Sequence, residues 1–343
     1  METVIAEYIW IDVNSNLRSK NRTIIYQGNL EFPEWNFDGS STGQAEVANS
    51  EIVLKPRAYF IDPFMTEKIR KIDEINNYKC YLVLCDCYDK DDNPAINNNR
   101  FNANLIFEKV KESEIWFGIE QEYIIYDKNF KSIVGWPKNG FPEPQGKYYC
   151  SIGADRAFGR EMVDEHYLKC LQAGIKICGT NAEVLPGQWE FQIGICEGIT
   201  AADHLWIARF ILVKVCEKYG FNVSFDPKPF LDWNGSGLHT NFSTKEIRES
   251  EGLNELYNAI NKLGTRHHDH IKVYGDNSKR LSGKHETSDI NEFTFGIGDR
   301  SSSIRIPSNI NKTKNKYLED RRPSSNADPY LVTSIIAETV LLF

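Results

Sequence analysis

The stretch WFGIEQEY, residues 116–123, decides the fold of the larger part of this chain. Aromatic and β-branched residues favour an extended backbone, in which successive side chains point to opposite faces of a sheet. Ile119 and Tyr123 share one face, whereas Glu120 and Glu122 share the other. The two carboxylates therefore project side by side, about 7 Å apart along the strand. This pattern predicts a sheet with one apolar face and one acidic face.

Two further segments repeat the pattern. QWEFQI (188–193) places Glu190 on the face opposite its aromatic side chains, and YLEDRRP (317–323) places Glu319 and Arg321 on one face. Several carboxylates on one surface repel one another unless cations neutralise them. Oxygen-rich sites of this kind suit Mg²⁺ and Mn²⁺. Together the three segments predict a sheet that holds divalent metal ions.

Imidazole and guanidinium side chains complement these acids. His239 opens a predicted strand directly after the glycine-rich turn 235–237, where an imidazole can serve as a metal ligand. Arginine binds carboxylate and phosphate groups through paired hydrogen bonds. Four arginines lie in polar segments: Arg280, Arg300, Arg305 and Arg321. Because metal ions with an arginine cluster are typical of phosphoryl transfer, the residues alone predict a metal-dependent enzyme with ATP as a candidate substrate.

The composition restricts the class of protein. The 343 residues include 48 acidic and 40 basic side chains, a net charge of −8, and 41% of them are hydrophobic. This excludes a wholly disordered chain and argues against a nucleic-acid-binding protein. No apolar run approaches the ~20 residues that span a bilayer, and the first residues do not resemble a targeting peptide. We therefore expect a cytoplasmic protein without membrane partners, whose eight cysteines are free thiols.

Two domains are expected, residues 1–96 and 97–343, divided within the polar stretch 89–100. The first is rich in strands, which include 8–11 and 80–87. Helices and strands alternate in the second, which indicates an α+β or α/β architecture. Its expected helices are 102–111, 160–176, 200–219 and 250–264, and its expected strands are 116–126, 188–193, 239–243, 303–307 and 317–321.

Three local signals refine these elements. The dipeptide Asp38-Gly39 favours a hairpin turn. Thr200 with Asp203 resembles a capping box at the start of the helix 200–219. Gly220 suits the residue that ends this helix in a left-handed conformation.

Nine segments match, in order, the motifs of one known family. They are WNFDGSST (35–42), WFGIEQEY (116–123), GWPKNGFPEPQGKYYC (135–150), NAEVLPGQWEFQIG (181–194), FDPKPF (225–230), WNGSGLHTNFST (233–244), KRLSGKHETSDIN (279–291), DRSSSIRIP (299–307) and YLEDRRPSSNADPY (317–330). The chain thereby resembles glutamine synthetase in its short eukaryotic-type (type II) form. The resemblance implies an α+β fold with an N-terminal β-grasp domain. A catalytic α/β domain would follow, whose curved antiparallel sheet forms a half-barrel flanked by helices.

The resemblance also implies a reaction and an assembly. L-glutamate, ammonium and ATP would give L-glutamine, ADP and phosphate through γ-glutamyl phosphate, for nitrogen assimilation and ammonia detoxification. Two or three Mg²⁺ or Mn²⁺ ions per site are implied as cofactors. A loop would close over the intermediate to exclude water. The homo-oligomer would be a decamer of two pentameric rings, in which a neighbouring N-terminal domain completes each active site.

By the same resemblance, matching positions receive roles in the chemistry. One metal ion would be held by Glu122, Glu183 and Glu190, and another by Glu120, His239 and Glu319. Ammonium would be bound by Asp38, Ser41, Tyr149 and Glu286. Within that set Asp38 would be the base, and Glu286 would lie on the closing loop.

The substrates receive the remaining positions. L-glutamate would be held by Asn234, Gly235, Arg280 and Arg321. Arg300 and Arg305 would stabilise the transferred phosphoryl group and the nucleotide phosphates. The nucleotide would be framed by Trp116, Asn241, Ser243, Arg248 and Tyr317. The groups expected to act in catalysis itself are Asp38, Glu286, Arg300 and Arg321.

Two other functions stay open at this point. A relative that ligates glutamate to another amine would differ at the ammonium site, and all four residues implied there are retained. A catalytically silent structural homologue would have lost metal ligands, and none of the six implied ligands is lost.

Overall fold

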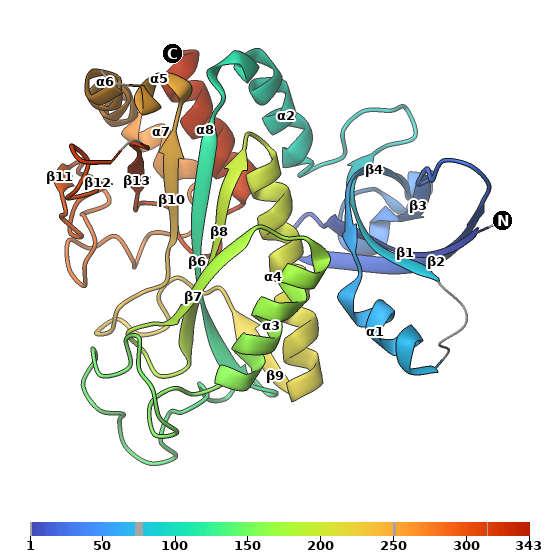
Figure 1. Cartoon of the computed structure of the whole chain (residues 1–343), viewed down its shortest axis with the longest axis horizontal. Coiled ribbons are helices and arrows are strands. Elements are labelled where there is room, and N and C mark those ends of the chain that lie inside the picture. The colour runs from blue at the N-terminus through green and yellow to red at the C-terminus, as the bar shows by residue number, and fades with distance from the viewer. Residues whose placement is uncertain (1, 73–77, 250–251, 314) are drawn as a thin grey trace. The chain divides into compact units, whose positions relative to one another are not determined.

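The computed structural model describes residues 2–72, 78–249, 252–313 and 315–343, which form two compact units (Figure 1). The N-terminal unit holds the residues up to 102 together with 168–175. The C-terminal unit holds 103–167 and 176–343. A domain boundary after residue 96 stays a prediction.

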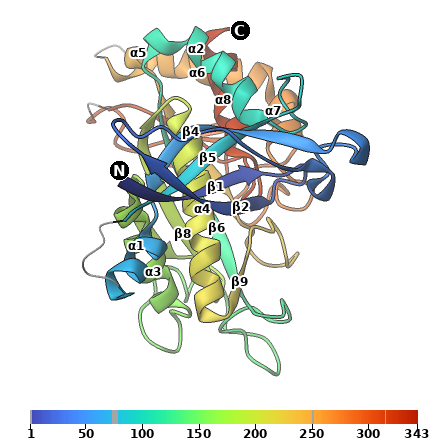
Figure 2. The ribbon, with the colours of Figure 1, turned by 90° about the vertical axis from the view of Figure 1, so that its right-hand side faces the viewer.

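A five-stranded sheet, in the order β2-β1-β5-β4-β3, builds the N-terminal unit (Figure 2). Its strands are β1 (Glu2–Ile11), β2 (Leu17–Tyr26), β3 (Trp35–Asp38), β4 (Glu51–Ile61) and β5 (Lys79–Tyr88). β1 and β5 run parallel, and the other neighbours are antiparallel. Helix α1 (Pro63–Ile72) contacts β5. The two strands predicted for this part of the chain lie within β1 and β5.

Aromatic contacts hold the short strand β3 in this unit. Tyr8 and Trp10 of β1 are buried. Trp10 stacks on Phe37 with 4.5 Å between ring centroids, and Tyr8 meets Trp35 edge-on at 5.5 Å. Such pairs add to the stability gained from burial of the rings. They fix β3, and therefore the position of Asp38 at its end, within the N-terminal unit.

The hairpin turn predicted at Asp38-Gly39 is wrong. The 3₁₀ helix η1 (Gly39–Thr42) follows β3 directly, and the Asp38 carboxylate accepts a hydrogen bond from the Ser40 amide at 3.0 Å. A second 3₁₀ helix, η2 (Val47–Asn49), precedes β4, with which β3 then pairs. An aspartate bonds the amides that follow it in a helical cap as readily as in a turn, so the dipeptide alone does not separate the two.

An eight-stranded sheet builds the C-terminal unit, in the order β11-β12-β13-β10-β6-β8-β7, with β9 paired to β6 (Figure 1). Its strands are β6 (Trp116–Asp127), β7 (Ile177–Ala182), β8 (Gln188–Glu197), β9 (Phe221–Ser224), β10 (Leu238–Ser243), β11 (Phe295–Ile297), β12 (Ile304–Ile306) and β13 (Leu318–Asp320). Neighbours are antiparallel except β11 and β12. The five predicted strands are all present, and β8 runs further than predicted.

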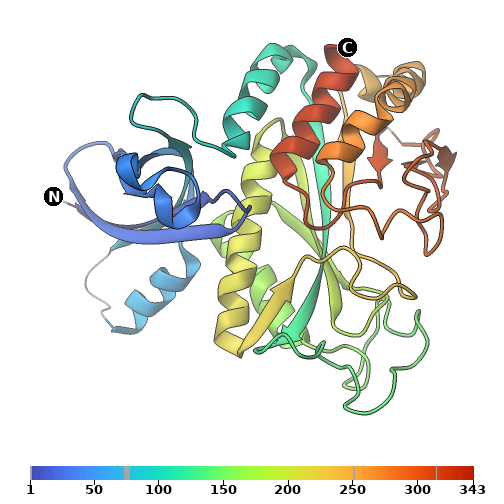
Figure 3. The ribbon, with the colours of Figure 1, turned by 180° about the vertical axis from the view of Figure 1, so that it is seen from behind.

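Helices pack on one face of this sheet, as Figure 3 shows from behind. Helix α4 (Thr200–Tyr219) contacts β6, β8 and β9, and α8 (Pro329–Leu341) contacts α4. The other helices from residue 99 onward are α2 (Asn99–Lys109), η3 (Lys111–Ser113), α3 (Arg160–Ala173), α5 (Lys245–Arg248), α6 (Gly252–Thr265) and α7 (His267–Val273). The predicted helices correspond to α2, α3, α4 and α6. Residues 250 and 251, with which the fourth was expected to begin, lie outside the described residues.

Helix α4 has the predicted span but not the predicted N-terminal cap. Gly220 has a φ of 66° and ends the helix as expected. Thr200 lies inside the helix, and its hydroxyl donates to the Glu197 carbonyl at 2.6 Å. Asp203 is buried and accepts a hydrogen bond from the Tyr330 hydroxyl of α8. The capping-box prediction is wrong because Asp203 has a partner more than a hundred residues away in sequence.

All eight cysteines are free thiols, as predicted, and only Cys150 and Cys178 are exposed. In the part of the chain that the structure describes, no helix has the length and apolar character needed to cross a membrane.

Candidate active site

The acidic face of the C-terminal sheet lines a cavity of about 560 Å³. The strands β6, β7, β8 and β10 contribute to its wall, together with the loops that surround them. Its lining includes most of the residues with a predicted role: Glu120, Glu122, Tyr149, Glu183, Glu190, Asn234, Gly235, His239, Arg280, Glu286, Arg300, Arg305 and Arg321.

Strand register brings the acidic residues together. β6 lies between β10 and β8, and Glu120 is directly opposite His239 of β10. Two residues along, Glu122 is directly opposite Glu190 of β8. Side chains opposite each other in antiparallel strands lie on the same face, about 5 Å apart at Cβ. The alternation recognised in the sequence therefore becomes a cluster that spans three strands.

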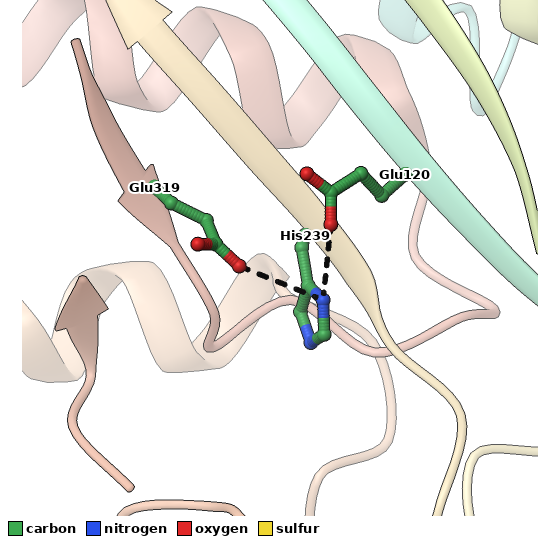
Figure 4. A group of neighbouring side chains, drawn as sticks. All are labelled: Glu120, His239 and Glu319. Atoms are coloured by element: carbon green, nitrogen blue, oxygen red, sulfur yellow. Dashed lines mark ion pairs between the residues drawn. The ribbon is translucent and has the colours of Figure 1, made fainter. Parts of the chain in front are cut away.

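Two overlapping groups of donor atoms lie within this cluster. The His239 Nδ1 atom is 3.6 Å from Glu120 Oε2 and 3.8 Å from Glu319 Oε1 (Figure 4). Ligand atoms of these three residues lie within 4.8 Å of one another, and so do those of Glu122, Glu190 and His239. The first group equals one predicted ligand set. In the second, His239 takes the place that was expected for Glu183, which lines the same cavity.

Crowded carboxyl groups hold protons in this cavity. Burial raises the pKa of Glu122 to about 7. Burial and the nearby Glu122 raise the pKa of Glu183 to about 8. Burial together with Glu120, Glu122 and Glu183 raises the pKa of Glu190 to about 9. These oxygens are hard donors without enough cationic partners, which is the chemistry that a divalent cation satisfies.

Arginines surround the acidic cluster. Glu319 is nearly inaccessible, and its two oxygens lie 2.8 Å from Arg305 Nε and 2.6 Å from Arg321 Nη1. Arg280 Nη2 lies 3.2 Å from His239 Nε2, which orients the imidazole ring. Burial lowers the pKa of Arg280 to about 10, so its guanidinium stays charged at neutral pH. Anionic substrates would meet fixed positive charges beside the carboxylates.

A strained loop segment borders the same cavity. His285 and Glu286 have φ angles of 54° and 62°, a left-handed conformation that is uncommon outside glycine. Such backbone strain clusters at ligand clamps and switch regions. His285, which lines the cavity beside Glu286, was not predicted, because no local signal indicates a left-handed backbone at these two residues.

A second cavity of about 610 Å³ is lined by the residues expected to frame the nucleotide: Trp116, Asn241, Ser243, Arg248 and Tyr317. The Arg248 guanidinium lies over the Trp116 ring, 3.7 Å from its centroid. Glu120 and Gln192 line both cavities, so the two spaces meet at β6 and β8. Lys316 and Cys178 also line this space and were not predicted.

Asp38 and Ser41 belong to the N-terminal unit, so their place in the active site stays a prediction. The Ser41 hydroxyl donates to Asp38 Oδ2 at 2.8 Å, and the Ser40 hydroxyl donates to Oδ1 at 2.7 Å. Hydrogen bonds from Ser40 and Ser41 lower the pKa of Asp38 to about 2. The exposed carboxylate is therefore fully ionised at neutral pH.

Comparison with known proteins decides the family. The model "Glutamine synthetase, beta-Grasp domain" matches residues 2–90, and "Glutamine synthetase, catalytic domain" matches residues 100–265. Glutamine synthetase from Kluyveromyces lactis is 51% identical over 98% of this chain and 88% of its own length. The chain belongs to the glutamine synthetase family. The glutamine synthetase cytosolic isozyme 1-1 of Oryza sativa is 50% identical over 100% of this chain and 95% of its own length.

These relatives confirm the predicted eukaryotic-type glutamine synthetase resemblance. A cryo-EM structure of Plasmodium falciparum glutamine synthetase superimposes with a TM-score of 0.77 at 17% identity, and covers 99% of this chain and 71% of that one. At this identity the likeness supports the fold. The predicted β-grasp domain and curved catalytic sheet flanked by helices are confirmed.

The glutamine synthetase motifs contain polar residues to which the sequence analysis gave no role. The buried Gln188 Nε2 donates to the Gly235 carbonyl at 3.1 Å and to Ser236 Oγ at 3.0 Å, and lies 3.4 Å from Glu122 Oε2. Gln188 thereby joins an acidic residue of β6 to the turn before β10. These hydrogen-bond partners of Gln188 could not be predicted from its position at the start of a strand, since they are distant in sequence.

Proposed function

We propose that this member of the glutamine synthetase family ligates ammonia to the γ-carboxylate of L-glutamate, with ATP converted to ADP and phosphate. One observation carries the proposal. Six carboxylates, two imidazoles and four arginines converge where an acidic cavity meets a second cavity with an aromatic and cationic wall. The first suits metal ions and a dicarboxylic amino acid, and the second suits a nucleotide.

The donor set fits two or three Mg²⁺ or Mn²⁺ ions, because its members are carboxylate oxygens and one imidazole nitrogen. We assign Glu122, Glu183 and Glu190 to one ion, and Glu120, His239 and Glu319 to another. When bound, such ions neutralise phosphate charge and polarise phosphoryl oxygens. The raised pKa values of Glu122, Glu183 and Glu190 imply that their protons leave as a cation binds.

ATP is expected to occupy the second cavity. The stacked Trp116 and Arg248 side chains offer a flat surface for a purine base. The polar groups of Asn241, Ser243 and Tyr317 complete this wall. Because Glu120 borders both cavities, the phosphates would extend from the nucleotide space into the acidic one. There Arg300 and Arg305 would bind the phosphoryl oxygens.

L-glutamate is expected to bind in the acidic cavity, with its carboxylates on Arg280 and Arg321 and its backbone groups near Asn234 and Gly235. An oxygen of the γ-carboxylate attacks the terminal phosphorus of ATP, and the bond to the bridging oxygen of ADP breaks. The products of this step are γ-glutamyl phosphate and ADP. Arg321 is at present paired with Glu319, so substrate binding exchanges one carboxylate partner for another.

Ammonium is expected to bind between Asp38, Ser41, Tyr149 and Glu286. The lowered pKa of Asp38 keeps its carboxylate ionised, which favours binding of a cation. Ammonium has no lone pair, so Asp38 would first take one proton from it, and the ammonia that results attacks the acyl carbon. The nitrogen becomes a far stronger acid as this bond forms, so its second excess proton is then readily lost. Phosphate then leaves and glutamine remains. Glu286, on the strained segment beside the cavity, would cover the acyl phosphate against water.

An isotope experiment tests the proposed function. The full-length protein is incubated with ATP, Mg²⁺, L-glutamate and ¹⁵N-ammonium, and products are identified by mass spectrometry. We expect ¹⁵N-glutamine and ADP in equal amounts. The same reaction with equimolar methylamine tests the alternative function, a ligase for another amine. A higher kcat/KM for methylamine than for ammonium would show that an amine, and not ammonium, is the substrate. Folded, metal-loaded protein that forms neither amide would contradict the proposal.

We further propose a decamer of two stacked pentameric rings in the cytosol. The N-terminal unit of one subunit would supply Asp38 and Ser41 to the cavity of its neighbour. Support comes from the Asp38 loop, which lies in a unit separate from the acidic cavity, and from relatives that include an isozyme named cytosolic. The boundary between the two domains would fall after residue 96.

A further inference from the structure

Strand β13 carries charged side chains on both of its faces. Glu319 lies within the candidate metal cluster and Arg321 lines the acidic cavity. Between and after them, Asp320 and Arg322 are completely inaccessible to solvent. Arg322 Nε lies 2.9 Å from Asp320 Oδ1, and Nη2 lies 2.6 Å from Oδ2. The sequence EDRR therefore forms two acid–arginine pairs, one in the site and one behind it.

A directional chain of hydrogen bonds ends on this hidden carboxylate. The Tyr274 hydroxyl donates to Asp320 Oδ2 at 2.7 Å. Because the hydroxyl proton of Tyr274 is used in this bond, its oxygen accepts a hydrogen bond from His270 Nδ1, which lies 2.6 Å away. The other ring nitrogen of His270 then accepts from Thr339 Oγ1 at 2.8 Å. Because only one order of donors satisfies every atom, α8 and α7 are joined to β13 by a chain of fixed sense.

A second branch leaves from the arginine. Arg322 Nη1 lies 3.1 Å from His267 Nδ1, which must be the acceptor because guanidinium only donates. The His267 Nε2 atom then donates to the Ile290 carbonyl at 2.9 Å. Ile290 lies a few residues after Glu286 in the same loop. The buried pair thereby also reaches the segment that borders the acidic cavity.

We propose that the buried network of Tyr274, His270, Asp320 and Arg322 positions Glu319 and Arg321 for metal and substrate binding. β13 has three residues and lies between β12 and β10, so its own length gives it little rigidity. Successive side chains leave opposite faces of a strand, so a fixed Asp320 fixes the direction in which Glu319 projects. Groups that orient metal ligands from behind contribute to metal affinity in the same way. The inference rests on the proposed role of Glu319.

The alternative is that the network only stabilises the fold, and a second buried tyrosine separates the two roles. The Tyr330 hydroxyl donates to Asp203 Oδ1 at 2.5 Å, and both residues are buried between α8 and α4. Neither is among the described residues that line the two cavities. Tyr274→Phe and Tyr330→Phe therefore delete the same chemical group from the same kind of hydrogen bond.

The test compares both variants with the wild type by Mn²⁺ titration calorimetry, by KM and kcat for glutamate, and by thermal unfolding. We expect Tyr274→Phe to weaken Mn²⁺ binding about three- to tenfold, less than the ~10- to 100-fold typical when a direct partner of a ligand is lost. KM for glutamate should rise, whereas Tyr330→Phe should keep wild-type Mn²⁺ binding at a comparable loss of Tm. Equal Mn²⁺ binding in the two variants would overturn the proposal.

A second variant covers the case in which Tyr274→Phe does not fold. Thr339→Val preserves side-chain shape and removes the hydroxyl that donates to His270 and accepts from Arg266 Nη1 at 3.3 Å. We expect a smaller weakening of Mn²⁺ binding in the same direction, and unchanged Mn²⁺ binding in this variant would contradict the network. Calorimetry is independent of turnover. Failure of the wild type to form glutamine would therefore refute the proposed function while the calorimetric comparison still decides the network.

Discussion

Three glutamates, Glu122, Glu183 and Glu190, determine how the candidate active site responds to pH. Their pKa values rise from 4.5 to about 7, 8 and 9 on folding. A carboxyl group whose pKa is higher in the folded chain favours folding while it is protonated in both states, below the unfolded pKa. That contribution is lost as the pH rises through the folded pKa. Metal-free protein should therefore lose stability between about pH 5 and about pH 9, and a divalent cation should restore it.

Glu190→Gln tests this balance, because it removes one charge and keeps the acceptor oxygen that Gln192 Nε2 contacts. In EDTA at about pH 9 the variant should be more stable than the wild type by about 1–3 kcal/mol, while at about pH 5 the two should agree. Urea unfolding at both pH values measures the difference. If the metal-free wild type is as stable as the variant at high pH, the ionised carboxyl groups do not destabilise the folded protein.

Asp38→Asn separates the two chemical steps. The change removes the negative charge proposed to bind ammonium and the base proposed to deprotonate it, but leaves the C-terminal unit untouched. Glutamine formation should therefore fall about 100-fold or more. Mn²⁺ affinity and ATP affinity, measured by calorimetry, should stay at wild-type values. A parallel loss of nucleotide affinity would show that Asp38 acts elsewhere.

At the scale of secondary structure, the pairing register of the strands determines which side chains reach the candidate active site. The alternation in 116–123 and 188–193 predicted which side chains share a face, and this held because strand parity is local. That His239 lies opposite Glu120 could not be predicted, since pairing of β10 with β6 depends on the whole chain. For the same reason the partners of Asp203 and Asp320 were missed.

Gly237, directly before β10, is predicted to be essential as a glycine. A Cβ atom there would lie 2.5 Å from Arg280 Nη2 and 2.7 Å from His239 Nε2. Gly237→Ala should displace both side chains and weaken Mn²⁺ binding about tenfold or more. Gly118→Ala is the matched control on β6, because its Cβ would meet Asn241 Cβ at an ordinary 3.6 Å. Calorimetry that finds equal Mn²⁺ affinity in the two variants would refute this packing argument.

At the scale of the whole molecule, part of the acidic excess behind the net charge of −8 lies in the candidate active site. Five of the acidic residues lie in the candidate metal cluster and its immediate surroundings, and two divalent cations there would offset half of that net charge. The family and fold could be predicted from the ordered motifs. The assembly could not be derived from the residues themselves, because the sequence pattern of one chain does not indicate which of its surfaces contact another subunit.

Subunit mixing tests the proposed assembly. Asp38→Asn and Glu183→Gln chains should each be inactive, but co-assembled particles should recover up to about a quarter of wild-type activity if neighbouring subunits share sites. Light scattering should give a mass near ten times the subunit mass of 39.4 kDa. Mixed particles of that mass without recovered activity would place each complete site within one chain.

The central claim is that this chain activates the γ-carboxylate of glutamate by phosphorylation. L-glutamate labelled with ¹⁸O in that carboxylate, together with ATP, Mg²⁺ and ammonium, tests it in one measurement by mass spectrometry of the released phosphate. If γ-glutamyl phosphate forms, one ¹⁸O atom per turnover passes into phosphate and the other remains in glutamine. Released phosphate that carries no ¹⁸O, with glutamine formed, would contradict the account.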